Sequence, residues 1–177
     1  MHVSSSKGFS LVETVIALGV LVTGVLGAAA VLASGMQNLS SSPADVVTTQ
    51  KAAEAIEAVF SARQSGKLTW AQLKNVSQGG VFLDLPQPMN LAGDDGLVNT
   101  ADDAAYGLES IRLPGKDQQL GNSDDQIIPL SNFTRQIVIS DIAGENGQLR
   151  SIVVTIVYQN GGRTRTYVLT TYLSAYS

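Results

Sequence analysis

The sequence predicts an α+β protein in which a long N-terminal helix, first apolar and then amphipathic, packs on a C-terminal antiparallel β-sheet. Two observations lead to this fold class. Apolar residues occupy 19 of the 28 positions from Phe9 to Met36, far above their share in a soluble domain. Three stretches near the C-terminus, residues 133–139, 149–158 and 164–173, are rich in β-branched and aromatic residues.

The N-terminal element is an uncharged run that predicts a helix long enough to cross a membrane. Residues 14–33 carry no charge, and a helix of 20 residues spans ~30 Å, the thickness of the hydrocarbon core of a bilayer. Such a run is either a membrane span or the apolar region of a secretory signal peptide, and Ala28–Ala30 and Ala33 offer the small residues that signal peptidase prefers. No second long apolar run follows, which excludes a protein with several membrane spans.

Glu13, at the edge of this run, separates the two interpretations. A charged side chain costs ~2.5–3.5 kcal/mol at the centre of a membrane helix, so an ionisable group in such a segment is functional by default. A signal peptide gains nothing from it, whereas a helix that packs in register against copies of itself can use it. After a cut between Gly8 and Phe9, Glu13 lies four residues beyond a new α-amino group and can pair with that group of a neighbouring subunit.

The segment Lys7-Gly8-Phe9-Ser10-Leu11-Val12-Glu13 resembles the processing site of type IV pilin-like precursors, and residues 15–27 are similar to V-type minor pilins and I-type minor pseudopilins. The resemblance implies that a prepilin peptidase cleaves after Gly8 and methylates Phe9, and that Glu13 guides assembly. It also implies a division of the chain into a leader, a transmembrane and polymerisation helix, and a soluble α+β head: residues 1–8, 9–36 and 37–177.

The function implied by the resemblance is that of a structural minor subunit of a type IV pilus or a type II secretion-like filament. Its partners would be other pilin or pseudopilin subunits, the prepilin peptidase, the inner membrane and the assembly platform. The chain would cross the bacterial inner membrane once, with its head in the periplasm, and then enter a filament in the periplasm or at the cell surface. The alternative is a secreted or membrane-anchored calcium-binding surface protein that does not polymerise.

Beyond the apolar run we expect the helix to be interrupted. Ser34-Gly35 weakens it, and Ser40–Pro43 offers an N-cap followed by proline at the first helical position. We expect a second helical stretch from Ala44 to about Ser65, with Gly66 as its stop. We expect its sheet-facing side to hold Val46, Ala53, Ile56 and Phe60, and a short second helix to add Trp70 and Leu73 to that packing.

The three strand-like stretches are expected to form two hairpins. Asn146-Gly147 and Asn160-Gly161 lie between them, and such pairs favour tight hairpin turns. Four arginines in or beside the strands are interpreted as solvent-facing charges, with docking against an acidic neighbour as the alternative: Arg135, Arg150, Arg163 and Arg165.

Composition argues against several classes of function. With a net charge of −4 the chain has no basic face for nucleic acid, and without cysteine it has no disulfide or thiolate metal site. The one histidine, His2, lies in the leader, so the mature chain lacks the base of a Ser-His-Asp or Cys-His arrangement. No Gly-rich phosphate loop follows a strand, and the carboxylates lie in turn-like loops rather than as a glycosidase pair. We therefore expect no enzymatic activity.

An acidic loop region, residues 84–128, contains an internal repeat. Residues 93–103 and 115–125 both read Gly-x-Asp-x-x-aliphatic-(Asn/Gly)-(Thr/Asn)-x-Asp-Asp, offset by 22 positions. Both copies resemble the Asp-rich calcium loops of bacterial surface and secreted proteins. The candidate ligands are Asp94, Asp95, Asn99, Asp102 and Asp103 in the first copy, and Asp117, Asn122, Asp124 and Asp125 in the second.

Oxygen ligands on a flexible loop favour calcium, one or two ions, over magnesium, which demands stricter geometry, and over zinc. The first copy is the better candidate, because Lys116 and Gln118 of the second replace Asp94 and Gly96 and lower both the charge and the flexibility. The alternative is a pair of Asx-type turns that bind no ion.

Overall fold

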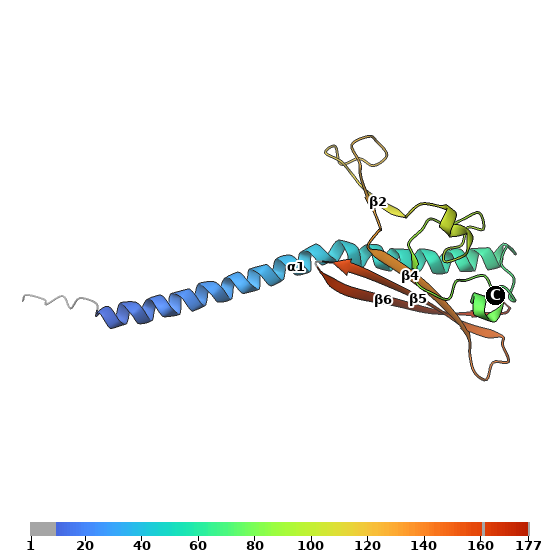
Figure 1. Cartoon of the computed structure of the whole chain (residues 1–177), viewed down its shortest axis with the longest axis horizontal. Helices are drawn as coiled ribbons and strands as arrows, with labels where there is room; N and C mark the ends of the chain where they lie inside the picture. The colour runs from blue at the N-terminus through green and yellow to red at the C-terminus, as the bar shows by residue number, and fades with distance from the viewer. Residues whose placement is uncertain (1–9, 161, 177) are drawn as a thin grey trace, which may run out of the picture. The chain divides into compact units, whose positions relative to one another are not determined.

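The computed structural model describes residues 10–160 and 162–176, without the side chains of residues 37–42. It shows a long apolar N-terminal helix and a C-terminal antiparallel sheet, an α+β arrangement (Figure 1). Helix α1 covers Leu11–Gln64, and the chain forms two compact units that meet between Ser42 and Pro43. Each unit is described by itself below.

The expected interruption of the helix is absent, because α1 runs without a break through Ser34-Gly35 and contains Pro43. The fixed φ of proline is compatible with a helix, and only its missing N–H and its ring weigh against an interior position. Helix α1 does not begin anew at Pro43, so the prediction of a second helix start there was wrong.

The first unit contains the apolar part of α1. Residues Leu11–Met36 are long and apolar enough to cross a membrane, as judged by length and composition alone. At 1.5 Å per residue these 26 residues span about 39 Å. All of their side chains are exposed in the structure. Lipid or other protein subunits would have to cover such an apolar helix surface.

The second unit holds the sheet, whose strands have the antiparallel order β1-β4-β5-β6. The strands are β1 (Gln87–Pro88), β4 (Phe133–Asp141), β5 (Leu149–Asn160) and β6 (Arg163–Ser174), so all three predicted strands are confirmed. Between β4 and β5 the N–H of Gln148 bonds to the carbonyl of Glu145, and Asn146 and Gly147 both have positive φ, as a type I′ turn requires.

A separate two-stranded ribbon lies between β1 and β4 in the sequence. Strands β2 (Ser110–Leu113) and β3 (Gln126–Pro129) pair with each other, and the second acidic loop connects them. Two short 3₁₀ helices complete the second unit: η1 (Val76–Gln78) and η2 (Asp102–Ala105).

The core of the second unit lies between α1 and one face of the sheet. Helix α1 contributes mostly small side chains at helical spacing: Thr48, Ala52, Ala55, Ile56, Val59 and Ala62. The sheet contributes β-branched ones, among them Ile137, Ile152 and Val154. Small residues on the helix let it approach the sheet closely while the strands fill the volume.

The structure therefore buries a different side of α1 from the one predicted, and that prediction was wrong. Of the four predicted residues only Ile56 is buried, whereas Val46 is 63% exposed and Phe60 is exposed as well. Leu73 is in the core and Trp70 packs against it, as expected, but residues 69–73 form turns rather than a second helix.

Candidate functional site

The residues predicted for processing and assembly lie at the N-terminus. Gly8 and Phe9 lie outside the described residues. Glu13 is in the first turn of α1 with its side chain exposed, where a carboxylate interacts favourably with the helix dipole. Its role in assembly stays a prediction.

The first acidic loop is closed by hydrogen bonds to its own carboxylates. Asp103 accepts from the N–H of Gly93 at 3.0 Å through Oδ1 and from the N–H of Thr100 at 3.1 Å through Oδ2. Asp102 Oδ1 accepts from the Thr100 hydroxyl at 2.7 Å. Burial raises the pKa of Asp103, whereas the Thr100 hydrogen bond lowers the pKa of Asp102.

Two other predicted ligands of the first loop are engaged by neighbouring side chains. Asn99 Oδ1 accepts from Arg135 Nε at 3.0 Å, and Asn99 Nδ2 donates to the Arg135 carbonyl at 2.7 Å. Asp94 accepts from the Tyr106 hydroxyl at 2.6 Å, a bond that raises the pKa of Tyr106. Both side chains thus have partners in the protein.

The sequence repeat is also a repeat of backbone geometry. The N–H of Gly96 bonds to the carbonyl of Gly93 at 3.1 Å, and the corresponding N–H of Gln118 bonds to that of Gly115 at 3.2 Å. Gly96 and Gln118 have φ of +73° and +58°, so the second copy keeps the turn although it lacks this glycine. The loss of flexibility expected from Gln118 does not change the conformation.

The carboxylates of the two loops follow the same pattern. Asp95 Oδ1 accepts from the N–H two residues ahead at 2.7 Å, and Asp117 Oδ1 does so at 3.0 Å. A Cβ at Gly93 would lie 2.1 Å from Asp102 Oδ2, and a Cβ at Gly115 would lie 2.3 Å from the Asp124 carboxylate. Glycine at the start of each copy therefore makes room for the acidic pair at its end.

In the structure these two loops do not bring their carboxylates together around a common point. Within residues 10–160 and 162–176 no three carboxylates or histidines are placed so that they could hold a metal ion. Several candidate oxygens accept backbone N–H groups, which is the Asx-turn arrangement weighed above. Calcium binding stays a prediction.

Two arginines predicted to face solvent are buried, which corrects that interpretation. Arg135 is 2% exposed and Arg150 is 3% exposed. Both lie on the inward face of a strand, Arg135 two residues before Ile137 and Arg150 two residues before Ile152. The period-2 alternation carried this information, because residues two apart share a face. Arg163 is exposed, and Arg165 is partly buried.

Arg135 is buried because it has partners on three sides. Its Nη1 pairs with Glu109 Oε1 at 2.9 Å, Asn99 accepts from its Nε, and the carbonyl of Asn90 accepts from its Nη2 at 3.4 Å. Lys51 of α1 approaches Glu109 Oε2 at 3.0 Å from the other side. Burial acts to lower the pKa of Lys51, but hydrogen bonds with Glu54 and Glu109 outweigh it and raise that pKa. The network connects α1, the first acidic loop and β4.

Arg150 holds the segment after α1 against the sheet. It pairs with Asp141 Oδ1 at 2.6 Å and donates to the carbonyls of Trp70 and Leu73. Its guanidinium lies 4.2 Å from the centre of the Trp70 ring, a cation–π contact. The hydrogen bond from Arg150 holds the pKa of Asp141 below its usual value.

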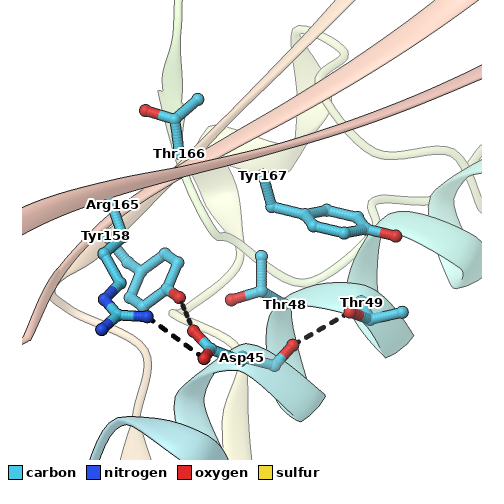
Figure 2. Close-up of a pocket in the computed structure, with 7 residues that line it drawn as sticks. All are labelled: Asp45, Thr48, Thr49, Tyr158, Arg165, Thr166 and Tyr167. Carbon is cyan, nitrogen blue, oxygen red and sulfur yellow. Dashed lines mark hydrogen bonds and ion pairs between the residues drawn. The ribbon is translucent and has the colours of Figure 1, made fainter. Parts of the chain in front are cut away.

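Sequence reasoning did not identify a polar pocket between α1 and the edge strand β6 (Figure 2). The pocket has a volume of about 520 Å³, and Asp45 is one of the residues that line it. Asp45 accepts from the Tyr158 hydroxyl and pairs with Arg165 at 3.3 Å. Burial, with the Asp45 hydrogen bond as a second cause, raises the pKa of Tyr158. No local pattern marks this pocket, because its parts are more than 100 residues apart in the sequence.

The pocket offers a carboxylate, a guanidinium and the Tyr167 hydroxyl, whereas the hydroxyls of Thr48 and Thr49 donate to backbone carbonyls of α1. Such a set suits hydrogen bonds and ion pairs with a polar group of another molecule. No family model, no curated protein and no solved structure significantly matches this chain. Support for a function therefore comes from the residues and contacts of this chain alone.

Proposed function

We propose that this chain is a structural minor subunit, a minor pilin or pseudopilin, of a type IV pilus or a type II secretion-like filament. In this proposal the apolar part of α1 holds the chain in the inner membrane before assembly and packs against other subunits afterwards. The head, residues 37–177, carries the contacts to neighbouring heads.

The observation that carries the proposal is the sequence of residues 7–27, in which a Gly-Phe junction precedes Glu13 at a set distance and an uncharged run follows. The structure supports it by placing Glu13 in the first turn of a helix whose next residues are apolar and exposed. An exposed apolar helix requires lipid or protein around it, and a carboxylate at its end requires a partner. A neighbouring subunit with a free α-amino group supplies both.

The N-terminus of the mature chain is the experimental test. Co-expressed with a prepilin peptidase, the chain should begin at an N-methylated Phe9, as read by mass spectrometry of the N-terminal peptide. Gly8→Val should block the cut, because the peptidase would meet a branched side chain at the scissile bond, and Ser6→Val is the matched control that should still be cleaved.

A second variant separates processing from assembly. Glu13→Gln should be cleaved and inserted in the membrane but should be missing from sheared filaments, since the amide cannot pair as an ion with the new α-amino group. A mature N-terminus near Ala33, or filaments that contain Glu13→Gln at the wild-type level, would contradict the proposal. The first of these results would favour a secreted surface protein that does not polymerise.

A further inference from the structure

The second acidic loop contains a buried carboxylate oxygen that lacks a hydrogen-bond partner. The side chain of Asp125 is 2% exposed, and its Oδ2 accepts from the N–H of Gly121 at 2.7 Å, so the carboxylate is turned into the loop. Arg112 Nη1 is 3.9 Å from the same oxygen and its side chain is largely exposed. Within the described part of the chain, Asp125 Oδ1 is buried without a partner.

A buried charged oxygen without a partner is unfavourable, because it has lost its hydrogen bonds to water and makes none with the protein. The repeat provides an internal comparison. Asp103 occupies the same position in the first copy, and donors of the protein, the N–H groups of Gly93 and Thr100, satisfy both of its oxygens. The first loop is therefore completed by its own hydrogen bonds, whereas the second leaves one oxygen open.

Further oxygen ligands lie in the same short loop. Asp124, next to Asp125, accepts from the N–H of Lys116 at 2.8 Å through Oδ2, and backbone carbonyls of the loop can add further oxygens. Both oxygens of Asp117, by contrast, already accept from Gln119 N–H at 3.0 Å and Asn122 Nδ2 at 2.6 Å. Apart from Gly115 and Asp125, residues 114–125 are exposed, so a hydrated cation can reach them. Carboxylate and backbone oxygens in a flexible loop are the ligands that calcium takes.

We propose that the second loop, rather than the first, binds a single calcium ion, with Asp125 Oδ1 as the buried ligand and Asp124 as the other carboxylate ligand. This reverses the order that charge and glycine content predict. It goes beyond the filament proposal and does not rest on it, because it depends only on the contacts within residues 112–125.

The ribbon that carries the loop explains what the ion would do. Strands β2 and β3 form a two-stranded sheet of their own, and an isolated pair of strands is marginally stable in water. Every residue of β3 is exposed. A cation bound between the two strand ends would hold the connection in one conformation and so stabilise the ribbon.

Calorimetric titration tests the proposal on the full chain in detergent micelles, with CaCl2 as the probe after removal of divalent ions by a chelator. The wild type should bind one ion per chain. Asp125→Asn should weaken binding at least tenfold, and so should Asp124→Asn at the neighbouring exposed position. An unchanged melting curve of the head in Trp70 fluorescence checks that both variants fold. The matched first-loop variants, Asp103→Asn and Asp95→Asn, should bind calcium with the wild-type affinity.

Trypsin cleavage after Lys116, an exposed residue of the second loop, gives an independent readout. Calcium should slow this cut at least fivefold in the wild type and in Asp95→Asn, and should leave the rate unchanged in Asp125→Asn. The proposal is overturned by a chain that binds no calcium, by a second ion, or by loss of binding in the first-loop variants instead. A chain cleaved after Gly8 that binds no calcium would overturn this inference alone, and a calcium-binding chain that keeps its leader would overturn only the filament proposal.

Discussion

Replacement of Arg135 by methionine tests whether the buried charge network holds the head together. The substitution keeps much of the side-chain volume but removes the ion pair with Glu109 Oε1 at 2.9 Å and the hydrogen bond to Asn99 Oδ1 at 3.0 Å. Removing one member of a buried ion pair costs about 3–5 kcal/mol, because the other is left charged and desolvated. Lys51 still lies 3.0 Å from Glu109 Oε2, so we expect the lower end of that range.

The free energy converts into a shift of the melting temperature. For a head of this size 1 kcal/mol corresponds to about 3 °C, so a loss of about 3 kcal/mol lowers the midpoint by roughly 10 °C. The chain has a single tryptophan, Trp70, which packs against the core of the head. Its fluorescence in detergent micelles reports unfolding of the head alone, whereas helical circular dichroism would be dominated by α1.

Arg163→Met is the matched control, since Arg163 is exposed at the first position of β6 and its loss should change stability by no more than about 0.5 kcal/mol. Glu109→Gln and the double variant complete a cycle, in which the coupling of Arg135 with Glu109 should amount to about 1–3 kcal/mol. A midpoint for Arg135→Met within about 3 °C of the wild type would refute the reasoning, because the network would then contribute little.

The fold class and the three long strands were predictable from local patterns. Alternation and β-branching depend on neighbouring residues, and the turn at Asn146-Gly147 needs only two residues that tolerate positive φ. The buried arginines were not predicted, because a charge was assigned to solvent by its residue type. What allows Arg135 inside is a set of partners 26–45 residues away in the sequence, and no local pattern contains them.

The buried face of α1 was also not predictable from the sequence pattern. The large apolar residues Val46 and Phe60 suggested the buried side, yet the structure buries the alanines at 52, 55 and 62 instead. A helix that packs closely on β-branched strands is selected for small size at the contact, and hydrophobicity alone does not measure this. The same holds for the acidic repeat, where composition identified both loops, but only the positions of the N–H donors show which carboxylate oxygen lacks one.

Two further predictions test the packing of α1 and the second buried arginine. Val59→Ala should destabilise the head by about 2 kcal/mol through lost burial and a cavity, while the exposed Val46→Ala should cost less than about 0.5 kcal/mol; equal losses in the Trp70 melt would contradict the observed face. For Asp141, the hydrogen bond from Arg150 lowers the pKa in the folded state below 3.8, so the folded protein favours the carboxylate. The resulting stability, about 0.5–1 kcal/mol for a partly exposed pair, is present above pH 3.8 and is lost as the pH falls below it. Asp141→Asn should therefore melt below the wild type near neutral pH and converge with it in acid, and a gap that stays constant as the pH falls through this range would show that the ion pair is not its cause.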